Sequence, residues 1–387
     1  MSRLPRPARR LARLSVGWAF AADVVPLYPL YALLFADNGL SDAEISVLFA
    51  IWSMVGMVAE VPSGAVADRF SRRYALMASG VMQGAGYAVW ILSPGFGGYA
   101  AGFALWAIAG ALVSGSFEAL LYDGLIAVEG QDHFGRVFGW VTGAGLFAQI
   151  PAALAATVLF GGGGYPLVGW VSVGCCLASS ALASQLPDAR PIKTGDPEPE
   201  PDGYLAVLRA GITEAAVHAG VRAAVLAVAA LAGLDGIDEY FSLIAHDWGV
   251  TTALVPVAVL AIPLTGAVGA ALGGVANRLG APALAGAFVL GVAAFALAGA
   301  LAHPAGLAGV AVFYGLYRMV LVVAQTRLQQ RITGPARATV TSVAALASEV
   351  SAIALYAAWA FGGLPFVVGL MAGVALMLPR WLRVETT

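Results

Sequence analysis

Long apolar stretches occupy most of this chain, and short breaks of glycine, proline and charged residues separate them. A bilayer-spanning helix needs about 20 apolar residues, whereas a barrel strand needs only about 10. The chain is 60% hydrophobic and 11% charged, against about 25% charged residues in soluble domains. The pattern therefore excludes a water-soluble globular protein and predicts an all-α polytopic membrane protein. We expect twelve transmembrane helices, at 14–36, 42–65, 75–94, 98–122, 137–160, 165–186, 221–245, 252–275, 282–302, 305–328, 338–361 and 364–380.

The beginning of the chain imitates a secretory signal. A basic region at 3–13 precedes an apolar run, and Ala19-Phe20-Ala21 is similar to a cleavage site. The apolar run continues past Asp23 to Phe35, which is long enough to cross a bilayer. We therefore expect an uncleaved first helix.

Basic residues lie almost entirely on one side of the predicted helices. Apart from Arg318, they fall at the N-terminus, at the C-terminus or at the ends of the helices that flank the loops 2/3, 4/5, 6/7, 8/9 and 10/11. The other loops contain no lysine or arginine. The positive-inside rule then predicts an even number of spans with both termini in the cytoplasm. Lys193 is the only lysine, and alanine and glycine are abundant, which is typical of a GC-rich bacterial genome. The expected location is the bacterial inner membrane.

Two segments recur at nearly one spacing, which indicates an internal duplication. Residues 35–41 are similar to 245–251, at an offset of 210, and 64–69 are similar to 273–278, at an offset of 209. We expect two pseudo-symmetric six-helix bundles, at 1–186 and 221–387. A proline-rich, acidic cytoplasmic linker at 187–220 joins them, with an amphipathic helix at 203–220 on the inner membrane surface.

The loop after the second predicted helix contains Gly64-Ala-Val-Ala-Asp68-Arg69-Phe-Ser-Arg72-Arg73. This pattern resembles the signature of the major facilitator superfamily. Glu60-Val-Pro62-Ser, the segment 117–123 and Arg337-Ala-Thr339 also resemble bacterial drug-exporter-like members. The resemblance covers nearly the whole chain and implies a twelve-helix secondary transporter, in which helices 1, 4, 7 and 10 line a cavity and helices 3, 6, 9 and 12 face outward.

The resemblance also implies a gating latch in which Arg69 pairs with Asp123 at the cytoplasmic end of helix 4. The alternative is that the arginines of this loop serve only as orientation charges. Glu60 belongs either to this charge network or to the substrate site. The residues of the predicted latch are Glu60, Gly64, Asp68, Arg69, Arg72, Arg73 and Asp123. Two features depart from the exporter pattern. Glu118 stands in helix 4, where exporters often carry arginine, and the glycines of helix 5 lead to Gln149-Ile150-Pro151 instead of Gly-Pro.

Several ionisable residues fall within the apolar spans, where each charge costs on the order of 3 kcal/mol. Such charges predict a water-filled passage. Together with two tyrosines they form the predicted proton-coupling and substrate site: Asp23, Tyr31, Glu118, Tyr122, Asp235, Asp238, Glu239, Arg318 and Glu349. Pro26 and Pro29 predict a kink just beyond Asp23. Asp23 is either a coupling or substrate-binding carboxylate, a hydrogen-bonded structural acid, or an acid exposed in a wide aqueous cavity.

Arg318 needs a carboxylate or an anionic substrate, because it stays charged. Glu349 is the simplest partner, and Asp235 and Glu239 are alternatives. The pair is either static or exchanged during transport. Asp235, Asp238 and Glu239 share one face of helix 7, and at least one of them should hold a proton near neutral pH unless they lie near the outer mouth.

Other sequence features exclude several function classes. Cys175 and Cys176 are adjacent in an apolar run and are interpreted as small core residues. The four histidines have no metal-ligand spacing, and Lys193 is preceded by Ile192, so neither a metal site nor a phosphate-binding loop is expected. We expect no cofactor, no enzymatic activity and no nucleic-acid partner.

An acid-rich cavity with aromatic residues favours lipophilic cations, although aromatics at helical spacing are more often packing or interface residues. The sequence thus predicts a monomeric, proton-coupled efflux transporter of a small amphipathic cation, with protons, substrate and membrane lipid as partners. The alternatives are uptake of a small anionic metabolite bound by Arg318, or a non-transporting membrane sensor or scaffold.

Overall fold

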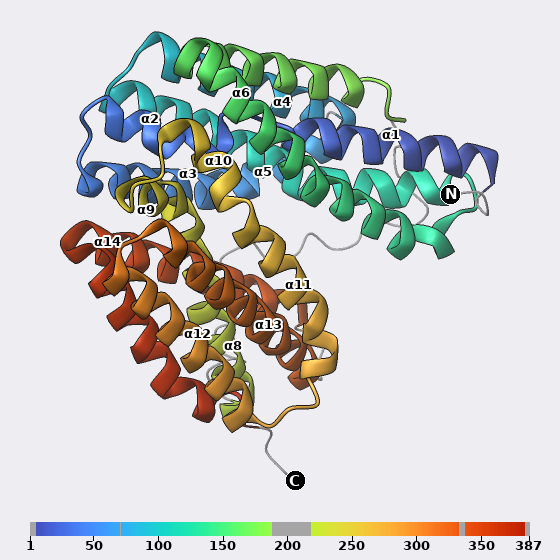
Figure 1. Ribbon diagram of the computed structural model, residues 1–387. Coiled ribbons are helices and arrows are strands. Elements are labelled where there is room, and N and C mark those ends of the chain that lie inside the picture. Colours follow the sequence, from blue (N-terminus) through green and yellow to red (C-terminus); the bar gives the residue numbers. More distant parts are fainter. Residues whose placement is uncertain (1–4, 70, 188–217, 333–336, 384–387) are drawn as a thin grey trace. The chain divides into compact units, whose positions relative to one another are not determined.

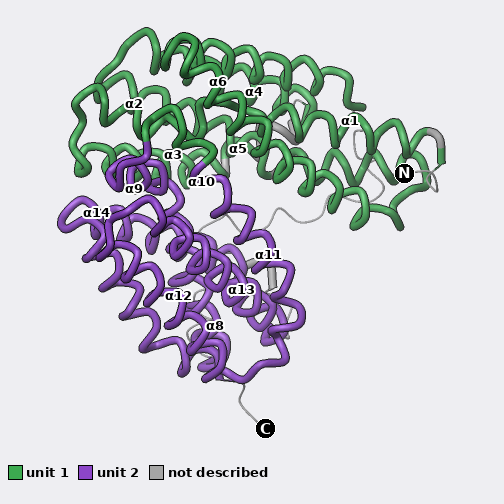
Figure 2. The backbone as a smooth tube through the Cα atoms, in the orientation of Figure 1, with its two compact units in different colours: residues 1–193, 251–257 green, residues 194–250, 258–387 purple. Residues whose placement is uncertain are grey.

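The computed structural model describes residues 5–69, 71–187, 218–332 and 337–383, apart from the side chains of 6, 61, 64–69, 115 and 337–339. The chain divides into two compact units, residues 1–193 with 251–257, and residues 194–250 with 258–387 (Figure 2). The division at 193 falls inside the expected linker 187–220. The expected amphipathic helix 203–220 lies outside the described residues, except for its last three positions.

Unit 1 contains the N-terminal helices (Figure 1). They are α1 (Arg6–Asp23), the 3-10 turn η1 (Tyr28–Leu30), α2 (Tyr31–Asp37), α3 (Asp42–Arg69), α4 (Arg72–Leu92), α5 (Phe96–Ile126), η2 (Gln131–His133) and α6 (Phe134–Ala183). Helix α4 packs against α5 and α6, α3 packs against α5, and α1 packs against α6. Glycines allow these close approaches, because a Cβ on Gly86 would lie 2.8 Å from the carbonyl oxygen of Gly102.

Unit 2 repeats this plan. Its elements are α8 (Ala219–Gly233), η3 (Leu234–Tyr240), α9 (Phe241–Asp247), α11 (Ala261–Ala276), α12 (Ala281–Leu301), η5 (Pro304–Gly306), α13 (Leu307–Arg331) and α14 (Arg337–Trp381). The turn η4 (Thr252–Leu254) and the first three residues of α10 (Val255–Val259) group with unit 1. Helix α13 packs against α11, α12 and α8, and α14 packs against α8 and α12.

The described residues contain ten helical stretches that are long and apolar enough to cross a membrane. Two of them, α6 and α14, are each divided by a pair of glycines with non-helical backbone angles. Gly164 has φ 60° and Gly363 has φ 58°, a region that glycine adopts most readily. The ten stretches therefore supply twelve crossings, and the predicted boundaries near 161–164 and 362–363 are confirmed.

The first helix of each unit is broken. In unit 1, α1 ends at Asp23 and the chain passes through Pro26 and Pro29 before α2, which confirms the kink predicted there. The helix also begins at Arg6, earlier than the predicted start at residue 14. In unit 2, the predicted continuous helix 221–245 is wrong, because the 3-10 segment η3 separates α8 from α9.

Matching hydrogen bonds join the second and fourth spans of each unit, which are α3 and α5 in unit 1 and α11 and α13 in unit 2. The Ser63 hydroxyl donates to the carbonyl oxygen of Ala111 at 2.9 Å, and the Thr265 hydroxyl donates to that of Ala311 at 2.9 Å. Each such bond within a membrane contributes about 0.6 kcal/mol. The shared contact shows that the internal duplication extends to side-chain detail.

A buried arginine joins the ends of three helices in unit 2. Arg327 of α13 is 5% exposed and donates to the carbonyl oxygens of Leu279, beyond α11, at 2.6 Å and of Leu382, beyond α14, at 2.8 Å. Carbonyl groups at a helix C-terminus lack intrahelical partners and carry partial negative charge, which a guanidinium satisfies.

Candidate functional site

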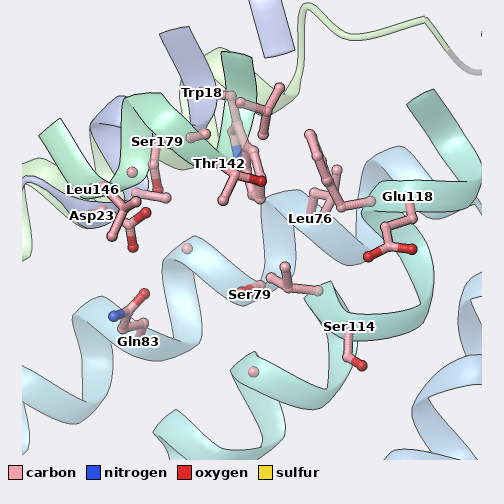
Figure 3. A pocket seen from close by; sticks show the side chains of 18 of the residues that line it. Trp18, Asp23, Leu76, Ser79, Gln83, Ser114, Glu118, Thr142, Leu146 and Ser179 are labelled. Atoms are coloured by element: carbon pink, nitrogen blue, oxygen red, sulfur yellow. The ribbon is translucent and has the colours of Figure 1, made fainter. Parts of the chain in front are cut away.

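A cavity of about 570 Å³ lies within unit 1, between α1, α4, α5 and α6 (Figure 3). This volume is within the usual range for small-molecule pockets, roughly 300 to 1,000 Å³. Its polar lining residues are Asp23, Ser79, Gln83, Ser114, Glu118, Thr142, Gln149 and Ser179. Helix α4, the third span, contributes Leu76, Ser79, Gly80 and Gln83. This corrects the expectation that the third helix faces only outward.

The break after α1 positions Asp23 at the cavity. Asp23 is the last residue of α1, and its side chain is exposed. Gly145 of α6 leaves room for the carboxylate, because a Cβ built there would lie 2.3 Å from Asp23 Oδ2. The structure thus places Asp23 at a cavity, and the three alternatives for its role stay predictions.

Glu118 supplies the second carboxylate of the cavity, from α5. Like Asp23, it is exposed. Figure 3 shows the two side chains at opposite ends of the view, with Ser79 and Trp18 between them. No lysine, arginine or histidine is found among the described residues that line the cavity. Among the described residues, neither carboxylate has a hydrogen-bond or ion-pair partner, so the cavity holds two uncompensated acids.

Aromatic rings form the apolar wall. Trp18 stacks on Phe117 with their centroids 4.5 Å apart, and Trp106 and Phe138 also line the cavity. Ser79 is 5% exposed, and its hydroxyl has no partner within the described part of the chain. The sequence analysis missed Ser79 and Gln83. Their signal was two polar residues four apart in an otherwise apolar helix, which places them on one face.

The two predicted tyrosines lie elsewhere. Tyr31 is 2% exposed and packs among the rings of Phe35, Trp90 and Phe103, so the expectation that it faces a cavity is wrong. It belongs to an aromatic core at the end of unit 1 that contains η1 and α2. Tyr122 is 45% exposed and contacts Phe134 edge-on, and it is not among the residues that line the cavity.

Unit 2 contains a polar network centred on Asp235. Arg318 of α13 forms an ion pair with Asp235 at 2.9 Å, and the Tyr314 hydroxyl donates to the same carboxylate at 2.9 Å. The guanidinium also lies 5.9 Å from the centroid of the Tyr314 ring. The side chains of Arg318 and Asp235 are 32% and 40% exposed. The partner that the structure shows is thus Asp235, which the sequence offered as an alternative to Glu349.

The predicted cluster of three acids is only partly confirmed. Asp235 and Asp238 lie three residues apart in the 3-10 segment η3, and they share a face because such a helix has three residues per turn. Glu239, the next residue, falls on another face and is 8% exposed. The Glu239 side chain has no hydrogen bond or ion pair within the described residues. Glu349 lies on α14 and is half-buried. An ionised carboxylate without a partner is costly in an apolar interior, so Glu239 is a candidate proton carrier.

The predicted latch is described only in part. Arg72, at the start of α4, forms an ion pair with Asp123 of α5. The guanidinium of Arg73 lies 5.3 Å from the centroid of the Tyr74 ring. The side chains of Gly64, Asp68 and Arg69 lie outside the described residues, so the predicted pairing of Arg69 with Asp123 stays a prediction. Glu60 accepts a hydrogen bond of 2.7 Å from Ser114, and this joins the motif to the cavity wall.

Comparisons with known proteins agree with this architecture. The sequence profile of the Major Facilitator Superfamily matches residues 13–357. A bacterial homologue of the human lysosomal transporter Spinster, in an inward-facing and unoccupied conformation, is 14% identical, with 98% of this chain and 96% of that chain covered and a TM-score of 0.73. Comparison with curated proteins gave no significant match.

Two further solved structures are similar in fold. The nucleoside transporter NupG is 11% identical, with 98% of this chain and 100% of that chain covered and a TM-score of 0.75. The D-xylose-proton symporter is 14% identical, with 98% of both chains covered and a TM-score of 0.68. At these identities the likeness concerns the fold alone. The profile match covers most of the sequence, and the chain therefore belongs to the major facilitator superfamily, a family of multi-pass membrane transporters rather than enzymes.

Proposed function

We propose that this protein exports a small amphipathic cation in exchange for protons, by alternating access. The observation that carries the proposal is the cavity of unit 1, which holds Asp23 and Glu118 and, within the part of the chain that the structure describes, no basic lining residue. Carboxylates attract a cation, and Trp18, Phe117 and Trp106 offer apolar and cation–π contacts to it. We place the protein in a bacterial inner membrane as a monomer with both termini in the cytoplasm, following the distribution of its arginines.

Exchange follows from the chemistry of the carboxylates. Asp23 and Glu118 bind either a cationic substrate or protons, because a protonated acid no longer attracts the cation. A cavity loaded with protons on one side of the membrane and with substrate on the other gives antiport. In unit 2, the unpartnered Glu239 offers a second proton position, separate from the Asp235–Arg318 pair.

A second candidate is uptake of a small anionic metabolite. Arg318 is 32% exposed, so an anion could replace Asp235 as its partner. One similar structure is named as a proton symporter of D-xylose, which supports proton coupling without favouring export. The non-transporting sensor or scaffold is less well supported, because a cavity with two unpaired acids gives no structural benefit.

Transport by purified protein in liposomes tests the proposal. The membrane potential is clamped with valinomycin and equal potassium, and a pH gradient is imposed. Antiport predicts that inside-acidic liposomes accumulate ethidium, as outgoing protons drive the cation inward. Asp23→Asn and Glu118→Gln should each lower the rate at least tenfold, whereas Asp132→Asn, which removes an exposed acid of η2, should not.

Three results would count against the proposal. Accumulation of ethidium under an outside-acidic gradient would indicate symport instead. Accumulation of a labelled small carboxylate under that gradient, lost in Arg318→Gln, would favour the second candidate. Rates equal to those of protein-free liposomes under both gradients would remove the cation exporter.

A further inference from the structure

The duplication aligns two residues of opposite charge. Ala111 and Ala311 accept the matching hydrogen bonds of the two units, and they stand 200 residues apart. Glu118 and Arg318 each follow seven residues later on α5 and α13, at the same offset of 200. Both belong to helices that carry the polar site of their own unit. One copy therefore has an acid where the other has a base.

The charge balance of the two sites differs as a result. In unit 2, Arg318 neutralises Asp235, which follows the end of α8 by two residues. In unit 1, Glu118 adds a second negative charge to that of Asp23, which ends α1. Both carboxylates of unit 1 line the cavity, and both side chains are exposed. A ligand that balances this cavity brings two positive charges.

The arrangement of the lining separates those charges. Asp23 follows Trp18 by five residues, which places it about 7.5 Å further along the helix axis. Glu118 follows Phe117, the ring on which Trp18 stacks. Trp18 lies between the two carboxylates in Figure 3, so this aromatic pair is placed beside the middle of a ligand that reaches both. Ser79 also lines this space and offers a hydroxyl to a ligand.

We infer that the ligand of the unit 1 cavity is an elongated organic dication, with two ammonium-type ends joined by an apolar middle. The inference rests on the proposed cation export and narrows its substrate class. One cationic end binds Asp23, the other binds Glu118, and the middle packs against Trp18 and Phe117. A single-charged cation leaves one of the two acids unbalanced.

Matched ligands test the charge count. Hexamethonium has a quaternary ammonium at each end of a six-carbon chain, and hexyltrimethylammonium has the same chain with one ammonium. Isothermal titration calorimetry on the purified full-length protein, at fixed ionic strength, should give at least tenfold tighter binding of hexamethonium. Glu118→Gln should remove that preference and leave the two affinities within about twofold. Asp132→Asn, which removes an acid outside the cavity, should keep the preference.

The outcomes separate this inference from the proposed function. Equal affinities in the wild-type protein, together with proton-driven transport of ethidium, would overturn the dication and leave the cation exporter in place. A preference for hexamethonium that persists in Glu118→Gln would also overturn it, because the second charge would then act elsewhere. If neither ammonium ion binds and ethidium is not transported, both proposals are wrong. Thermal unfolding of each variant shows whether a lost affinity reflects a lost fold, and Glu118→Asp, which keeps the charge, should then preserve the preference.

Discussion

The two units have the same framework and different polar sites. Each breaks its first helix, α1 at Asp23 and α8 at Gly233, and each bends a long helix at a glycine pair. In each unit a hydrogen bond from a hydroxyl to an alanine carbonyl oxygen also joins the second and fourth spans. The acids near the two breaks differ, however, because Asp23 shares a cavity with Glu118 and Asp235 binds Arg318. Backbone hydrogen bonding and close packing restrict which residues the helical framework can contain. A side chain that lines a cavity has fewer such constraints, so it can differ between the two units.

The largest effect should come from making unit 1 resemble unit 2. Glu118→Arg would place a guanidinium in the cavity that also holds Asp23, and we expect it to abolish cation binding, with at least a hundredfold loss of affinity. Calorimetry with a cationic ligand measures this. Glu118→Gln is the control that removes the charge without adding a base, and it should lose less. Undiminished affinity in Glu118→Arg would show that the difference between the units has no bearing on cation selection.

Breaking the ion pair of unit 2 should have the next largest effect. Arg318→Gln leaves Asp235 without its charged partner. Breaking a fully buried pair costs about 3–5 kcal/mol, and the cost here should be lower because both side chains are partly exposed to solvent. We expect a clear drop in the temperature of unfolding in detergent. The exchange Asp235→Arg with Arg318→Asp should recover part of it. Two losses that simply add, with no recovery in the exchanged variant, would contradict a direct interaction between these two side chains.

A smaller effect is expected where the fifth span approaches Asp23. Gly145→Ala places a methyl group at the position of the Asp23 carboxylate, so we expect roughly tenfold weaker cation binding. Gly143→Ala is a matched control two residues away, because a Cβ there meets nothing within 4 Å. Titration of both variants with one ligand is the measurement. Similar losses in the two alanine variants would point to a general effect on α6.

The smallest effect should be the same in both units. Ser63→Ala and Thr265→Val each remove one interhelical hydrogen bond, and we expect each to reduce stability by about 0.6 kcal/mol. Chemical denaturation in detergent, followed by the loss of helical circular dichroism, compares them. A cost several times larger in one unit would show that the shared framework has diverged as well.

The sequence predicted the framework better than the sites. Long apolar runs, glycine pairs and prolines specify helices and their breaks through local chemistry, so the twelve spans and the kink after Asp23 could be found. The pairing of Arg318 depended on which helices meet, and three acids lay within its predicted reach. Tyr31 had the same sequence pattern as an aromatic residue that lines a cavity. Its side chain, directly after the break at η1, is instead buried in the aromatic core. Ser79 and Gln83 were overlooked because neutral polar residues are inexpensive in a membrane helix.

The Arg327 contacts have a practical consequence for shortening or tagging the chain. This guanidinium uses the carbonyl oxygen of Leu382, a few residues before the last position, as one of its acceptors. A deletion that removes Leu382 would leave a buried cation short of an acceptor and loosen the ends of α11 and α14 together. A purification handle is therefore better fused after Thr387 than used to replace the final helical turn.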